Sequence, residues 1–136
     1  MARNVLKTMA KRTSEVLTLS GDTDSSAIDM KDYHRLLVSI VGATITGDIT
    51  KFNLLAYSDS GLTTGETTIA TGASFPTADG DYAFLEIDAS ELSSVGTDLR
   101  YVKAVVAGTD TDKVVLNVEQ GSPAFCEDGL TADSIT

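Results

Sequence analysis

The sequence has few of the residues from which reactive and metal-binding sites are built. It contains one cysteine, Cys126, one histidine, His34, and no tryptophan. A lone cysteine cannot form a disulfide within the chain, and a zinc site needs about three or four suitable ligands. A nucleophilic pair of Cys126 and His34 is formally available, but nothing in the sequence places the two together. We therefore expect no catalytic residue, no metal site and no cofactor, and a protein that is not an enzyme.

Long hydrophobic runs and known site motifs are missing as well. No stretch approaches the roughly 18 consecutive apolar residues of a membrane span, and the charged N-terminus does not resemble a secretory signal. There is no Gly-x-Ser-x-Gly elbow, no P-loop and no Gly-x-Gly-x-x-Gly. Asp22-x-Asp24-x-Ser26 invites a calcium interpretation, but Ala27 and Tyr33 stand where an EF-hand loop needs Gly and Glu. We interpret residues 21–26 as a turn-rich loop, and we expect no membrane partner.

Acidic residues dominate the chain after its first twelve positions. Residues 1–12 contain Arg3, Lys7, Lys11 and Arg12 and no acid, whereas the remainder carries 20 acids and six bases. An acidic body repels phosphate, so we expect no sequence-specific nucleic-acid binding. The basic segment has two interpretations. It is either a solvated end or an arm that docks on an acidic surface or lies near packaged nucleic acid.

Alternating apolar and polar residues predict short β-strands. We expect strands at 15–20, 34–42, 51–57, 67–71, 82–88, 100–107 and 113–119. Nearly every position of 34–42 is apolar, which is typical of a strand covered on both faces. Most phenylalanines fall in strand patterns and are expected in the core. Gly47-Asp48 predicts a hairpin turn, residues 89–94 one helical turn, and Gly121-Ser-Pro123 the end of the last strand.

Six or seven short strands at regular spacing are typical of a β-sandwich or barrel. We predict an all-β protein with a single jelly-roll-like β-sandwich of two antiparallel sheets and extended N- and C-terminal arms. The expected divisions are a basic N-terminal arm at 1–12, the sandwich domain at 13–122 and a C-terminal tail at 123–136.

Several segments together resemble one family. They are Gly21-Asp-Thr-Asp-Ser-Ser-Ala-Ile-Asp-Met30, Tyr33, the apolar strand Leu36–Val41, Gly47-Asp48, and Asp98-Leu-Arg-Tyr-Val-Lys103 with the last strand and short tail that follow it. In this pattern the chain resembles small structural proteins of tailed-bacteriophage heads, over roughly residues 13–122. Among these it is most similar to the capsid cement, or decoration, proteins of jelly-roll type.

The resemblance implies a non-enzymatic virion structural protein that binds the outside of the major capsid shell and stabilises it by bridging neighbouring capsomers. It implies no reaction and no cofactor. The expected partners are the major capsid protein and further copies of this chain, with a homodimer favoured over a homotrimer because symmetric dimers are the commonest oligomers. The expected location is the capsid surface of a virion assembled in the host bacterial cytoplasm. Arg3, Lys7, Lys11 and Arg12 would form a capsid-binding arm.

Other functions stay open at this point. The chain could instead be a carbohydrate-binding or other attachment module of a phage particle, or a head-completion protein or fibre base. Jelly rolls that bind sugars usually stack an exposed Trp or Tyr on the ring. The absence of Trp, with only four Tyr in the chain, weakens that alternative.

Overall fold

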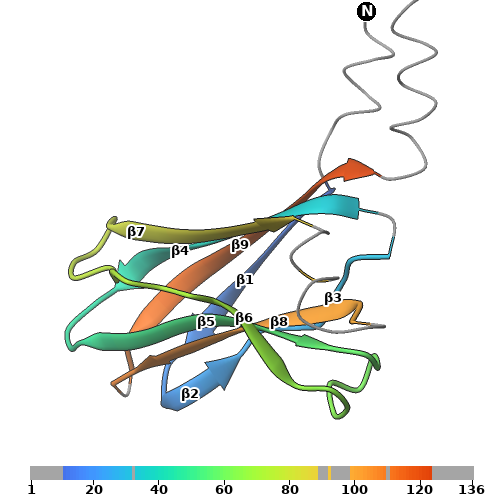
Figure 1. Cartoon of the computed structure of the whole chain (residues 1–136). Helices are drawn as coiled ribbons and strands as arrows, with labels where there is room; N and C mark the ends of the chain where they lie inside the picture. Colours follow the sequence, from blue (N-terminus) through green and yellow to red (C-terminus); the bar gives the residue numbers. More distant parts are fainter. Residues whose placement is uncertain (1–10, 32, 89–91, 93–98, 110, 124–136) are drawn as a thin grey trace, which may run out of the picture.

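The computed structural model describes residues 11–31, 33–88, 92, 99–109 and 111–123. In these residues nine β-strands form two antiparallel sheets that pack face to face (Figure 1). The strands are β1 (Lys11–Thr18), β2 (Gly21–Asp24), β3 (Ile28–Asp29), β4 (Tyr33–Thr44), β5 (Ile49–Tyr57), β6 (Thr67–Thr71), β7 (Tyr82–Asp88), β8 (Tyr101–Gly108) and β9 (Lys113–Pro123).

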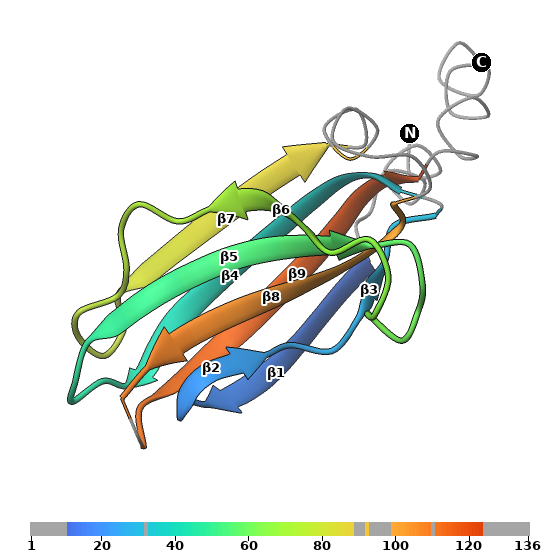
Figure 2. The ribbon, with the colours of Figure 1, turned by 60° about the horizontal axis from the view of Figure 1, so that its bottom comes forward.

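The strand order confirms the predicted jelly-roll-like sandwich. The four-stranded sheet has the order β1-β9-β4-β7, and the five-stranded sheet has the order β2-β8-β5-β6, with β3 also paired to β8. The chain crosses from one sheet to the other at every connection except β2–β3 and β5–β6 (Figure 2). This repeated crossing between two antiparallel layers is the jelly-roll arrangement.

The core lies between the two sheets and is built by alternation along each strand. Every second side chain of a strand points to the same face, so one face of each sheet supplies the core. The fully or almost fully buried side chains include Leu36, Val38, Ile40, Phe52, Leu54, Val102, Val106, Val114, Leu116 and Val118. In β5, β8 and β9 the buried face is the one on which apolar residues alternate in the sequence.

Two strands form where the sequence predicts none. β2 lies within the turn-rich loop predicted at 21–26, and β3 follows it at Ile28–Asp29; β2 pairs with β8 from Gly21↔Gly108 to Asp24↔Val105. Their polar composition hid them because β2 lies at the edge of its sheet, where exposed Asp and Thr side chains carry no burial cost. The first strand also begins four residues earlier than predicted, because Lys11 to Ser14 pair with β9.

The predicted hairpin turn and the predicted end of the last strand are both wrong. Gly47-Asp48 does not close a hairpin, because β4 lies in the four-stranded sheet and β5 in the five-stranded sheet. Gly121 does not end the last strand either, since β9 stays paired with β4 through Arg35↔Gly121 and Tyr33↔Pro123. The helical turn predicted at 89–94 lies outside the described residues, apart from the buried Leu92.

Two of the segments that carry the sequence resemblance, 21–30 and 98–103, meet at residues 29–30 and 100–101. Asp29 pairs with Tyr101 in the sheet, and the Met30 N–H donates to the Arg100 carbonyl at 2.9 Å. The Arg100 guanidinium donates two hydrogen bonds to the Asp29 carboxylate, each 2.7 Å long. These side-chain hydrogen bonds from Arg100 are the main cause that lowers the pKa of Asp29. A bidentate ion pair therefore fastens β3 to the start of β8.

A buried carboxylate closes one end of the sandwich. Asp112 is fully buried, and its side chain accepts hydrogen bonds from the Thr46 N–H (2.8 Å), the Gly47 N–H (3.1 Å) and the Thr109 hydroxyl (3.2 Å). Its carbonyl accepts a further bond from the Leu19 N–H at 2.8 Å. The Thr46 N–H is the main cause that lowers the pKa of Asp112, and burial opposes it. Asp112 falls between two of the predicted strands, where nothing in the sequence indicates burial, and it joins three connections.

Asp112→Asn should lower the melting temperature by roughly 5 °C or more, although the two side chains have the same shape. An amide nitrogen would face backbone N–H donors and would leave at least one of them buried without an acceptor. Asp22→Asn is the control, because its exposed ion pair with Lys51 should contribute little. Thermal unfolding followed by circular dichroism at neutral pH compares the two variants. Equal melting temperatures would contradict the role of Asp112.

The same carboxylate predicts how stability depends on pH. Because the folded-state pKa of Asp112 is below the ordinary value of 3.8, its contribution to stability is complete above that value. That contribution is lost as the pH falls through the lowered folded-state pKa. The free energy of unfolding of the wild type should therefore fall more steeply in this acid range than that of Asp112→Asn. Parallel curves in denaturant titrations between pH about 5 and about 2 would contradict this linkage.

Val38→Asp should unfold the domain, because Val38 is fully buried at the centre of β4. An unpaired charge at such a position costs about 4 kcal/mol or more. Ser39→Asp is the matched control, since the neighbouring side chain points to the outer face of the same strand. A normal melting transition for Val38→Asp would show that β4 is misplaced.

Candidate binding surface

The outer face of the four-stranded sheet carries a continuous line of apolar side chains. The strand registers align Val16, Val115, Val41 and Tyr82 across all four strands, and we call this line the valine row. The next line, the polar row, aligns Ser14, Asn117, Ser39 and Phe84. Leu37 lies on the same face of β4, two residues from Ser39. We call Val16, Leu37, Val41, Tyr82, Phe84 and Val115 together the apolar face.

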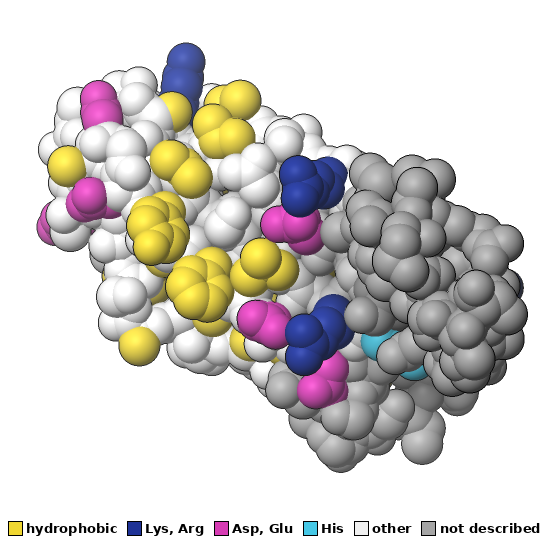
Figure 3. All heavy atoms as spheres, turned by 90° about the horizontal axis from the view of Figure 1, so that it is seen from above, with side chains coloured by type: hydrophobic (Ala, Val, Ile, Leu, Met, Phe, Trp, Pro, Cys, Tyr) yellow, Lys and Arg dark blue, Asp and Glu magenta, His cyan; other side chains and the backbone are white. Residues whose placement is uncertain are grey.

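This face is open to solvent. Tyr82 is 69% exposed, Val16 63% and Phe84 57%, and they are the large hydrophobic residues that stand out as exposed among the described residues. Figure 3 looks down on this sheet and shows the hydrophobic side chains gathered in a band, with basic and acidic side chains beside it. A contiguous apolar patch with a charged border is typical of a surface that binds another protein.

The predicted double coverage of residues 34–42 is therefore wrong for the single chain. Leu36, Val38 and Ile40 are buried, but Leu37 and Val41 are only half-buried on the outer face. The expectation that phenylalanines belong to the core is also wrong at Phe84. The apolar run itself was a correct signal, because it marks a strand with two apolar faces. What the sequence did not reveal is that no part of the sandwich covers the second face.

Charged residues border the apolar face at one end. Arg12, Glu119, Leu37 and Glu86 form the line after the polar row, and Arg12 Nε donates to Glu119 Oε1 at 3.1 Å. Beyond them a hollow of about 230 Å³ is lined by Arg35, Leu37, Glu86, Glu119 and Gly121, with Leu36. A Cβ atom added at Gly121 would meet nothing within 4 Å, so the missing side chain leaves this hollow open.

The structure places two of the four predicted arm residues. Lys11 and Arg12 belong to β1, where they pair with Gln120 and Glu119, and both are exposed. Both are thus part of the sheet, and Arg12 lies on its outer face and borders the apolar face, whereas Lys11 points to the other face of β1. Arg3 and Lys7 lie outside the described residues.

The outer face of the five-stranded sheet forms a second, polar surface. A groove of about 430 Å³ is lined by Asp22, Asp24, Lys51, Asn53, Leu55, Glu66, Thr68, Lys103 and Val105. Lys51 pairs with Asp22 at 3.0 Å and Lys103 with Asp24 at 2.9 Å. The hydrogen bond that Lys103 donates to the Asp24 carboxylate is the main cause that raises the pKa of Lys103. We call this surface the polar groove. Its two lysines are paired with aspartates, Glu66 accepts a hydrogen bond from the Tyr57 hydroxyl at 3.1 Å, and no aromatic side chain is among the residues that line it.

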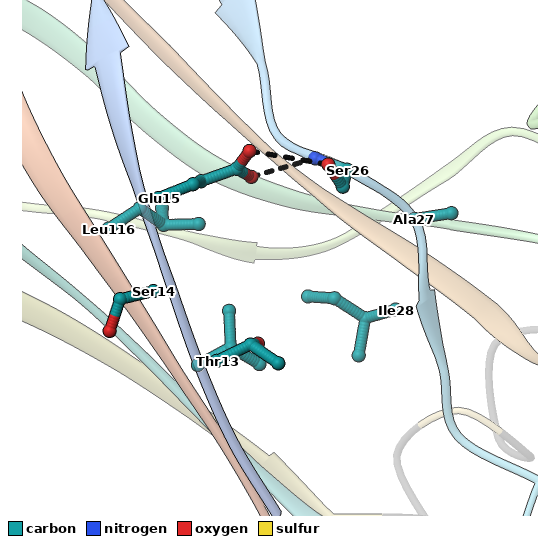
Figure 4. A pocket seen from close by; sticks show the side chains of 8 residues that line it. Thr13, Ser14, Glu15, Ser26, Ala27, Ile28 and Leu116 are labelled. Carbon is teal, nitrogen blue, oxygen red and sulfur yellow. Dashed lines mark hydrogen bonds between the residues drawn. The ribbon is translucent and has the colours of Figure 1, made fainter.

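A small hollow opens where the two sheets separate at their edge (Figure 4). Its volume is about 230 Å³, and the core residues Leu116 and Val118 form part of its lining. The Glu15 carboxylate extends from β1 across the opening and accepts hydrogen bonds from the Ser26 N–H (2.8 Å) and the Ser26 hydroxyl (3.2 Å). The Glu15 side chain therefore links β1 of one sheet to the segment after β2 of the other.

The remaining candidates from the sequence do not converge on a site. His34 is half-buried at the start of β4, and Cys126 lies outside the described residues. Within the described ranges no three His, Cys, Asp or Glu side chains are grouped so that they could hold a metal ion. In the same part of the chain no helix has the length and hydrophobicity to cross a membrane.

No protein-family model matches the chain, and no curated protein matches its sequence. Solved structures similar to it include the SPBc2 prophage-derived protein YomS, at 14% identity over 82% of this chain and 95% of that one, with a TM-score of 0.49. Another is a structure of Bacillus endospore appendages, described as disulfide-linked pili. It has 11% identity over 82% of this chain and 86% of that one, with a TM-score of 0.41. A third is a family 11 carbohydrate-binding module from Clostridium thermocellum, with 13% identity over 84% of this chain and 85% of that one and a TM-score of 0.38. At these identities and scores the similarity assigns no function to this chain.

Tyr82→Ser combined with Phe84→Ser should change the free energy of unfolding by less than about 1 kcal/mol at low protein concentration, because both side chains project into solvent. Phe52→Ser is the control, since Phe52 is fully buried and its loss should cost about 3–5 kcal/mol. Urea unfolding measures both. A large loss in the double variant would mean that these aromatic residues belong to the core.

Proposed function

We propose that this chain is a non-enzymatic virion structural protein that binds the outside of a bacteriophage major capsid shell and bridges neighbouring capsomers. The observation that carries the proposal is the apolar face, in which the valine row runs across all four strands of one sheet. Such a surface gains free energy when another protein covers it. A rigid sandwich that presents an adhesive face needs no chemistry to act as a structural protein.

The sequence resemblance supports the virion assignment. Two of its segments meet at the Asp29–Arg100 ion pair, so these two parts of the resemblance belong to one structural unit. A cement protein must hold more than one neighbour, and this body offers separate surfaces for that purpose. The apolar face on the outer side of the four-stranded sheet can take a further copy of this chain, and the basic residues at one end of the body can take the shell.

The basic residues support contact with the shell at one end of the body. Lys11 pairs with Gln120, so the described chain starts beside the far part of β9. Arg12 and Arg35 lie at this same end, and Arg3 and Lys7 precede it in the sequence. We propose that these bases bind an acidic capsid surface, with an affinity that falls as salt rises.

A carbohydrate-binding role is less well supported. The groove on the five-stranded sheet is the largest hollow described, but its lining has no aromatic ring on which a sugar could stack. The exposed aromatic residues Tyr82 and Phe84 instead lie on the apolar face, among valines.

The test mixes the purified chain with phage heads that were assembled without it. We expect saturable co-sedimentation and a higher temperature of head disruption. Arg3→Glu combined with Lys7→Glu should weaken binding by about tenfold, because the charge reversal opposes an acidic shell. Lys51→Glu, a single charge reversal on the opposite sheet, is the control and should bind nearly as the wild type does.

Absence of any co-sedimentation at low salt would overturn the capsid assignment. In that case a glycan array would examine the attachment alternative. Equal binding by the charge-reversed and wild-type chains would show that the basic segment is a solvated end.

A further inference from the structure

We propose that the apolar face is the interface of a symmetric homodimer, in which two copies stack their four-stranded sheets face to face. The inference concerns what covers this face and does not require the capsid assignment. It rests on the strand register, on the charges that border the face and on the area the face provides.

The register makes the face complementary to itself. Consider a two-fold axis that lies in the plane of the interface, perpendicular to the strands, midway between the valine row and the polar row. Rotation about this axis places Tyr82 of one copy opposite Phe84 of the other, and the reverse, along β7. Each strand faces its own equivalent, as an isologous interface requires. The two aromatic pairs can then pack edge to face at the rim of the interface.

The same rotation brings opposite charges together on β9. Lys113 lies two residues before Val115, and Glu119 lies two residues after Asn117, all on the outer face. The two-fold axis therefore places Lys113 of each copy opposite Glu119 of the other. Stacked sheets cross at about 30°, and long side chains can span the offset that this angle introduces. Lys113 is exposed, and no ion pair of Lys113 is found in the described residues.

The charge of the face also fits a second copy. The whole chain has a net charge of −10, so most of its surface should repel another copy. On the outer face of this sheet, however, the three bases Arg12, Arg35 and Lys113 are balanced by the three acids Glu86, Asp88 and Glu119. Two copies can approach through this face without the repulsion that acts elsewhere.

The size of the face agrees with a dimer of moderate affinity. Four strands about 4.8 Å apart, over about eight residues of about 3.3 Å each, give a flat area of roughly 500 Å² per copy. The two copies together then approach the roughly 1,000 Å² that a specific interface needs, and a corrugated surface buries more than its flat projection. We therefore expect dissociation in the micromolar range.

Sedimentation equilibrium of the purified full chain, from about 1 μM to about 200 μM, tests the proposal. We expect a monomer–dimer equilibrium for the wild type. Tyr82→Asp should weaken dimerisation by about a hundredfold, because it buries a charge at the interface. Lys51→Glu, on the opposite sheet, should leave the dissociation constant unchanged.

A charge-swap series tests the two-fold arrangement itself. Lys113→Glu and Glu119→Lys should each weaken dimerisation by about tenfold, since each places like charges opposite one another. The double variant, with both changes, should return to within about threefold of the wild type. Circular dichroism checks that every variant is folded. If neither single change affects dimerisation, or if the double variant is as weak as the single ones, this arrangement is wrong.

Other results would overturn the inference as a whole. These are a monomer at every concentration, a trimer, or a dimer that Tyr82→Asp does not affect. A wild-type monomer that dimerises only after residues 1–10 or 124–136 are removed would show that the chain's own end covers the face. None of these experiments uses phage heads, so failure of the dimer and failure of capsid binding are distinguished.

Discussion

The register between β4 and β9 is the constraint on which the rest of the structure depends. The pairing of Val38 with Val118 and of Ile40 with Leu116 sends these four side chains into the core. The same pairing sets Val41 beside Val115 on the outside. A slip of β9 by one residue would turn its inner side chains to the outer face, so the register is fixed by burial of the inner face. The composition of the binding surface is thus a direct consequence of how the core is packed.

Side-chain hydrogen bonds hold several of the connections between strands. Asp112 joins the β1–β2, β4–β5 and β8–β9 connections through its side chain and its carbonyl group. Glu15 and the Asp29–Arg100 pair do the same at the open edge and at the start of β8. A jelly roll places residues distant in sequence on neighbouring strands, so its loops need such links to keep the two layers aligned. The stability of the body should therefore be more sensitive to acid than its exposed ion pairs suggest.

The two outer faces of the sandwich have different physical characters. The polar groove pairs its lysines with aspartates of the same chain, so its charges are satisfied internally. The apolar face leaves Tyr82 and Phe84 in solvent and carries a balanced charged border. If two copies cover this face, the resulting unit carries two basic segments and two polar grooves. A bivalent unit can bridge neighbouring sites with contacts that are individually weak, because the second contact forms at a high effective concentration.

The sequence by itself determined that the protein is all-β and which side chains of its long strands alternate. Positions such as Phe52 and Leu54, or Val102 and Val106, follow from a period of two that depends only on local backbone geometry. It could not show β2 and β3, because edge strands tolerate the polar residues that also form turns. Nor could it show that Asp112 is buried or that Phe84 is exposed. Those properties depend on which strands become neighbours and which face of each sheet is covered, and only the tertiary packing of the two layers decides that.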